Sequence, residues 1–85
     1  MTVKVTITEC YGDRRTFTST HRDAETAERN AIQKAYGRGK FLCLDRGLTQ
    51  PGSSTRYGQI GHYINKQRNQ ISTDTGRVRV EIETI

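Results

Sequence analysis

Four side chains of the types that bind zinc occur in this chain of 85 residues: Cys10, His21, Cys43 and His62. Zinc sites of small domains hold their ligands in close pairs of Cys or His. The four residues are instead spread singly along the chain, so no local pair forms a metal site. Cys43 lies between Leu42 and Leu44, a setting typical of a small buried hydrophobic side chain. We therefore expect no metal and no other cofactor.

Acid–base and nucleophilic chemistry find no support in the sequence. A nucleophile needs a base and a third group that orients the base, and neither histidine lies in a recognisable catalytic turn. Glu81 and Glu83 are two residues apart on one face of an expected strand. This arrangement is typical of solvent-exposed charges rather than of a pair of catalytic acids. A chain this short also has little interior for a pocket that excludes water. We expect a protein that is not an enzyme.

Three glycine-containing stretches superficially resemble nucleic-acid or phosphate-binding segments. Gly37-Arg38-Gly39-Lys40 follows an expected helix, whereas a phosphate loop precedes one. Gly58-Gln59-Ile60-Gly61 matches the Gly-x-x-Gly loop of KH domains, but no convincing helix flanks it. Gly39-Lys40-Phe41 is similar to an RNA-recognition strand, although the aromatic spacing does not continue. None of the three identifies a binding fold.

The basic residues are the remaining candidates for a functional site. The chain has 14 Lys and Arg against 9 Asp and Glu, a net charge of +5, and an isoelectric point near 9.6. Arg forms bidentate pairs with phosphate or carboxylate, so its excess over Lys favours a contact surface for an acidic partner. The alternative is a scattered, solvated surface with ordinary core tyrosines. The predicted contact residues are Arg14, Arg15, Arg38, Lys40, Arg56, Tyr57, Lys66, Arg68, Arg77 and Arg79.

We expect one helix to help position these residues. The sequence contains its apolar face, the residue that caps its N-terminus and the residue that ends it. Between Asp23 and Gly37, alanines recur at steps of three and four and form one face, which Ile32 and Tyr36 widen. Asp23 is placed to cap the first turn, and Gly37 to end the helix. A face of alanines permits close packing on a flat partner, so we expect this helix to cover a sheet.

Strands account for most of the remaining chain. Val3, Val5 and Ile7 alternate with polar residues, and a turn at Tyr11-Gly12-Asp13 leads to a returning strand over 15–20 with Phe17 inward. The apolar run over 40–45 predicts a strand in a central position of the sheet.

The second half of the chain is harder to interpret. Residues 46–58 read as a long polar loop. The segment 57–71 fits a helix or a strand, and its glycines and β-branched residues favour a strand over 59–65. Asp74-Thr75-Gly76 reads as a turn that joins 70–73 to a strand with Val78, Val80 and Ile82 inward, as a hairpin.

These elements predict an α+β fold in one compact domain, residues 1–85. A single helix would pack on one face of a mostly antiparallel sheet of four to five strands, in the order ββαβββ. The opposite sheet face would carry threonines together with Arg77 and Arg79. No apolar run approaches a membrane span of roughly 20 residues, and the N-terminal residues do not have the layout of a signal peptide. We expect a cytoplasmic protein in which Cys10 and Cys43 are free thiols rather than one disulfide.

The arrangement resembles that of small single-domain proteins that phages encode to disable host machinery, anti-CRISPR proteins in particular. The resemblance lies in the 3–20 hairpin, the helix start at Asp23-Ala24-Glu25-Thr26-Ala27 and the following strands. It includes no diagnostic motif, so it carries over no functional residue. It implies a non-enzymatic inhibitor of a host protein or nucleoprotein complex such as a CRISPR effector, acting from the host cytoplasm if phage-encoded. The alternative is a module of phage or bacterial origin that binds DNA or RNA phosphates directly.

Overall fold

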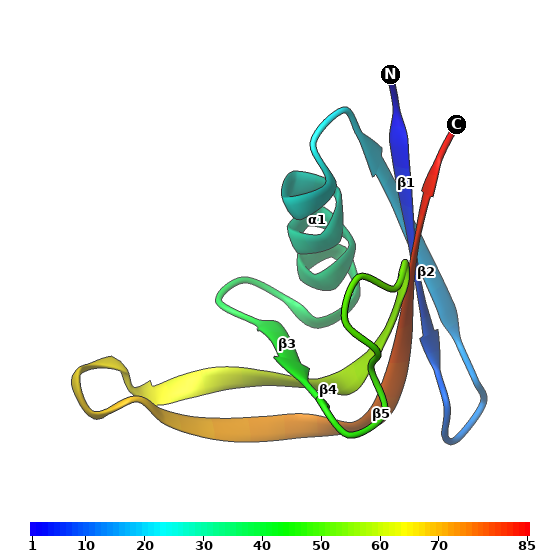
Figure 1. Ribbon diagram of the computed structural model, residues 1–85. Helices are drawn as coiled ribbons and strands as arrows, with labels where there is room; N and C mark the ends of the chain where they lie inside the picture. Colours follow the sequence, from blue (N-terminus) through cyan, green and yellow to red (C-terminus); the bar gives the residue numbers. More distant parts are fainter.

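Five strands form one antiparallel sheet in the computed structural model, which describes residues 1–85. The elements are β1 (Val3–Glu9), β2 (Thr16–His21), α1 (Ala24–Tyr36), β3 (Phe41–Leu44), β4 (Thr55–Asn65), the 3-10 helix η1 (Lys66–Arg68) and β5 (Gln70–Thr84). The strand order in the sheet is β2-β1-β5-β4-β3, and α1 covers one face (Figure 1). The α+β class and the ββαβββ order predicted from the sequence are confirmed.

The N-terminal hairpin forms as predicted. Ile7 on β1 pairs with Phe17 on β2, and Val5 pairs with Ser19. Val5 and Ile7 are completely buried, because alternate residues of a strand point to the same face. The hairpin therefore supplies most of the surface on which α1 packs.

Helix α1 begins and ends at the predicted caps. The Asp23 carboxylate accepts a 3.2 Å hydrogen bond from the Thr26 N–H, and Gly37 ends the helix with a φ of 105°. Ala27, Ala31 and Ile32 are buried against the sheet. Together with Val5, Ile7, Ile60, Val78 and Val80 they make up the core.

Strand β3 lies at an edge of the sheet, so the predicted central position is wrong. It pairs only with β4. Its apolar run is explained by partial burial of its side chains on both faces of the strand. Leu42 packs against the core, the Phe41 ring stacks on Tyr63 with centroids 4.9 Å apart, and Leu44 is exposed.

The predicted turn at Asp74-Thr75-Gly76 is also wrong, because β5 runs through it without a break. Arg77 pairs with Gln59 and Thr73 pairs with Gly61, so three β5 residues lie opposite Ile60 in a bulge. The Thr75 hydroxyl accepts a 3.0 Å hydrogen bond from the Ile60 N–H. Residues typical of turns here bend a strand instead of reversing it.

The partner of 70–73 is consequently β4, and η1 with Asn69 makes the reversal between β4 and β5. The strand predicted over 59–65 is confirmed, and it begins earlier, at Thr55. The predicted loop over 46–58 is thus too long at its C-terminal end. Thr49 supports the start of β4, since its hydroxyl oxygen accepts a 2.9 Å hydrogen bond from the Tyr57 N–H.

The one α-helix has 13 residues, and no helix of the structure has the length and apolarity that a membrane crossing requires.

Candidate functional site

A two-stranded arm projects from the sheet. It comprises residues 61–73: the end of β4 from Gly61, the η1 turn with Asn69, and the start of β5 to Thr73. Beyond β3 the arm runs away from α1 and the rest of the sheet (Figure 1). Ile64 and Ile71 on the arm are 67% and 44% exposed. Apolar side chains are therefore held in solvent on an element that contributes no buried residue beyond Gly61.

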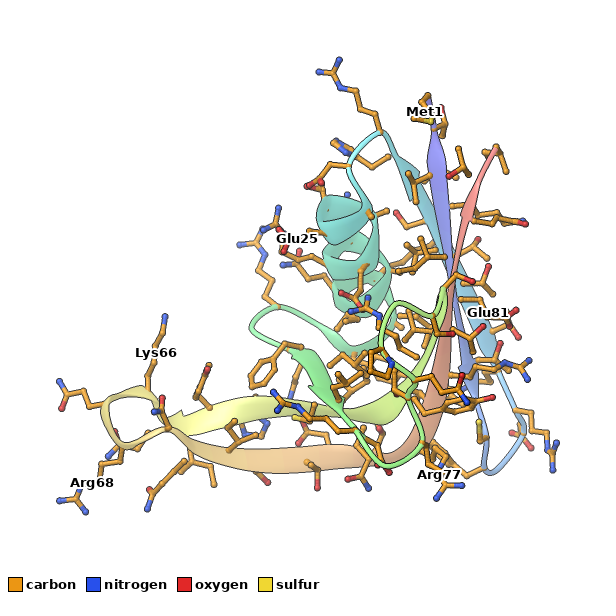
Figure 2. All side chains as sticks on the ribbon, viewed as in Figure 1. Met1, Glu25, Lys66, Arg68, Arg77 and Glu81 are labelled. Atoms are coloured by element: carbon orange, nitrogen blue, oxygen red, sulfur yellow. The ribbon has the colours of Figure 1, made fainter.

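The tip of the arm is positively charged. Lys66 and Arg68 point outward at its end (Figure 2), are exposed, and do not belong to any of the ion pairs of the structure. No Asp or Glu occurs between Asp45 and Asp74, so the arm itself carries no negative charge. Among the predicted contact residues, this is the one pair of unpaired cations within a single short element.

The backbone at the tip is fixed locally. The Asn65 side-chain oxygen accepts hydrogen bonds from the Gln67 and Arg68 N–H groups, at 3.1 and 3.3 Å. Asn69 adopts the left-handed conformation with φ 54°, which Asn tolerates better than most residues. Both cations are thus presented from a defined turn rather than from a loose loop.

Four of the predicted contact residues are neutralised by acidic neighbours. Arg15 contacts Glu9 at 2.9 Å, Lys40 contacts Asp74 at 2.8 Å, and Arg56 contacts Glu28. The Arg79 Nε atom lies 2.9 Å from Glu81 Oε1 without hydrogen-bond geometry. Paired cations attract a phosphate less strongly, because the neighbouring carboxylate repels it.

Of the other predicted residues, Tyr57 and Arg77 line one shallow pocket together with Leu48, whereas Arg14 and Arg38 lie elsewhere. Arg14 is exposed in the β1–β2 turn, Arg38 follows α1, and Arg77 is exposed on β5. Tyr57 is half-buried and lies directly across from Arg79 on the sheet face opposite α1. The structure therefore brings together only Lys66 and Arg68 as free charges.

Side chains at the base of the arm hold its direction. The Lys40 ammonium and the His62 Nδ1 atom each lie 2.8 Å from the same Asp74 oxygen. The hydrogen bond from Lys40, aided by His62, holds the pKa of the Asp74 carboxyl below its ordinary value. Phe41 stacks on Tyr63 beside this cluster. The arm is thereby tied to β3 and to the segment before it.

Two glycines allow β4 to lie this close to its neighbours. A Cβ on Gly58 would come 2.3 Å from the Cys43 carbonyl oxygen, and one on Gly61 would come 2.6 Å from the Ser72 carbonyl oxygen. No side chain fits at such distances. The GxxG motif thus serves strand packing at the arm's base, and it does not form the loop of a KH domain.

A buried carboxylate lies on β1, outside the arm, where Glu9 pairs with Val78 of β5. Glu9 is 2% exposed and accepts hydrogen bonds from Arg15, Tyr11 and Tyr36. These bonds, that from Arg15 foremost, lower the pKa of Glu9 although burial opposes the charge. Burial and the adjacent carboxylate raise the pKa of Tyr36. Every oxygen of this cluster is engaged in joining the hairpin turn to the end of α1.

The four zinc-type side chains do not converge. No group of three or more His, Cys, Asp or Glu side chains is arranged to hold a metal ion. Both cysteines are free, and partial burial raises the pKa of the Cys43 thiol.

A shallow groove of about 320 Å³ lies between α1 and β3. Its apolar side chains are those of Ile32, Phe41, Leu42 and Leu44. Glu28, paired with Arg56, also lines it. Of its cations, Lys40 is paired with Asp74 and Arg56 with Glu28. The remaining charged side chains of the lining, Arg29 and Glu25, have opposite signs, so the groove offers no preference for an acidic partner.

Sequence reasoning considered Tyr63 as a stacking or interface residue, but it missed the exposed isoleucines and carboxamides of the arm, namely Ile64, Gln67, Asn69, Gln70 and Ile71. One signal was available: the acid-free interval between Asp45 and Asp74. No protein-family model, curated protein or solved structure matches the chain.

Proposed function

We propose that this protein is a non-enzymatic binding protein that contacts nucleic acid through the arm. The observation that carries the proposal is the contrast in charge between the arm and the body. Lys66 and Arg68 are exposed and unpaired at the end of an acid-free projection. Arg15, Lys40, Arg56 and Arg79 in the body each contact a carboxylate.

Phosphate backbones are the acidic partner that such an element suits best. Lys and Arg that contact phosphates release condensed counterions, and this release supplies most of non-specific nucleic-acid affinity. A narrow projection reaches between two backbones, where a flat patch of equal charge touches only one. The cytoplasm is the compartment we propose, since free cysteines persist there.

Charge reversal at the tip tests the proposal. Fluorescence anisotropy with a labelled 30-base-pair DNA and its single strand, at 50 mM salt, compares wild type with Lys66→Glu/Arg68→Glu. We expect the variant to lose at least about tenfold in affinity. Arg29→Glu/Lys34→Glu is the matched control, because it changes the net charge equally at exposed positions of α1. Equal losses in both variants, or no binding by wild type, would overturn the proposal.

The inhibitor expected from the resemblance to anti-CRISPR proteins stays a prediction. Such a protein would use the same cations against the DNA or guide RNA of a host effector complex, or against an acidic protein surface. It would show little affinity for naked nucleic acid at physiological salt, and capture from host lysate followed by mass spectrometry would then identify its target.

A further inference from the structure

We infer that the arm enters the major groove of duplex DNA and contacts base edges there. This inference rests on the proposed function and narrows it from nucleic acid in general to one form and one groove.

The dimensions of the arm fit that groove. Five β4 residues, 61–65, separate its base from its tip, a reach of about 16 Å at about 3.3 Å per residue. The major groove of B-DNA is roughly 12 Å wide and 8.5 Å deep and admits a two-stranded ribbon, whereas the minor groove is only about 6 Å wide. The arm is therefore long enough to reach base edges while the body remains outside the backbones.

The side chains near the tip match what the major groove displays. Gln67 and Gln70 are exposed carboxamides, and such groups form paired hydrogen bonds with adenine. Ile64 and Ile71, exposed on the same arm, suit the thymine methyl group, which only the major groove presents. Binding to phosphates alone would have no use for exposed isoleucines.

Other nucleic-acid forms fit less well. Proteins bind single strands by stacking bases on aromatic rings, yet residues 64–71 contain no aromatic side chain. Tyr63, at the base of the arm, is 42% exposed and packs against Phe41, so the arm lacks the series of aromatic rings on which successive bases stack. The major groove of duplex RNA is deep and too narrow for side chains to read. Duplex DNA is the form left with a complementary surface.

The arm is also oriented before it binds. The Lys40–Asp74 ion pair and the Phe41–Tyr63 stack hold its base, and Asn65 fixes the turn at its end. An element that is already ordered loses less conformational entropy on binding.

Competition among four probes of one base sequence tests the inference: duplex DNA, duplex RNA, single-stranded DNA, and duplex DNA whose cytosines carry bulky glucosyl groups that fill the major groove. We expect unmodified duplex DNA to bind at least about tenfold more tightly than the other three. Gln67→Ala/Gln70→Ala should weaken binding to duplex DNA and leave the salt dependence unchanged, because it removes no phosphate contact. Circular dichroism and the melting temperature check that this variant is folded.

The outcomes separate the two proposals. Equal binding to the glucosylated duplex or to duplex RNA would overturn groove entry while leaving nucleic-acid binding intact. Absence of binding to all four probes at low salt would overturn the proposed function itself. If binding is unchanged in Gln67→Ala/Gln70→Ala but is lost in Lys66→Glu/Arg68→Glu, then the arm contacts phosphates only. That result would overturn the contact with base edges.

Discussion

The Tyr36 hydroxyl at the end of α1 donates a 2.9 Å hydrogen bond to the Glu9 carboxylate on β1. Tyr11 and Arg15 donate to the same carboxylate, so one buried acid joins the helix end, the hairpin turn and the first strand. A carboxylate at 2% exposure is costly unless its oxygens are satisfied. Here three side chains donate hydrogen bonds to them. Loss of the charge should therefore destabilise the whole domain.

Glu9→Gln should lower the free energy of unfolding by about 2 to 3 kcal/mol, because it removes the charge that Arg15 and both tyrosines solvate. Urea denaturation at pH 7 measures this change. Glu83→Gln, at an exposed position of β5, is the control and should change stability by less than about 0.5 kcal/mol. An unchanged free energy of unfolding in Glu9→Gln would mean that the hydrogen bonds around Glu9 contribute little to stability.

The pH dependence of stability follows from the same residue. Folding lowers the pKa of Glu9 from its ordinary value of 4.5, so the folded state holds its proton less tightly than the unfolded chain. This stabilisation is present above pH 4.5 and is lost as the pH falls through the lower folded pKa. The melting temperature of wild type should therefore drop more steeply than that of Glu9→Gln below pH 5. Parallel curves for the two proteins would contradict this assignment.

Ala31→Arg should unfold the domain or cost about 4 kcal/mol or more, since Ala31 is completely buried between α1 and the sheet and the site holds neither the volume nor the charge of Arg. Thermal melting by circular dichroism measures the effect. Gln33→Arg adds the same charge at an exposed position of the same helix and should be neutral. If both variants melted at similar temperatures, Ala31 would not lie in the core, and the face of α1 that packs on the sheet would have been assigned wrongly.

The accuracy of the sequence-based prediction depends on how local each signal is. Asp23 and Gly37 act within one helix turn, and Gly12 acts within one hairpin, so α1 and the β1–β2 hairpin could be predicted. Asp74-Thr75-Gly76 has turn composition, but the pairing of Thr73 with Gly61 and of Arg77 with Gln59 converts it into a bulge. That pairing joins residues far apart in the chain, and no local pattern reveals it.

The candidate site was predicted in part for the same reason. The cations Lys66 and Arg68 were identified from their type and charge. Their isolation on an arm depends on the register of β4 and β5, and the neutralisation of Arg56 by Glu28 depends on where α1 lies over the sheet. Charge counts along a sequence do not distinguish paired cations from free ones.

Gly61→Ala should destabilise the arm by about 1 to 3 kcal/mol, because the added Cβ would meet the Ser72 carbonyl oxygen at 2.6 Å and the Cys43 Sγ atom at 3.0 Å. The expected result is faster amide exchange in 61–73 with protection retained at Ile7 and Val80. Gly47→Ala is the control, since the added Cβ there meets only the Asp45 carboxylate, at 3.3 Å. Unchanged exchange in the arm would show that β4 and β3 adjust at this contact.

Asp74→Asn should loosen the base of the arm, because Lys40 and His62 both contact the carboxylate oxygen that loses its charge. Amide exchange in 61–65 and 70–73 should accelerate at pH 7, while the core amides of Val5 and Ile7 stay protected. Lowering the pH through the folded pKa of Asp74, which lies below its ordinary value, should reduce the protection factors of the same amides in wild type, because the contact is lost only when that carboxyl is protonated. Asp13→Asn, in the exposed β1–β2 turn, should leave the arm unchanged. If the arm exchanges at the same rate in wild type and in Asp74→Asn, then the Phe41–Tyr63 stack alone sets its direction, and Phe41→Ala becomes the variant that frees it.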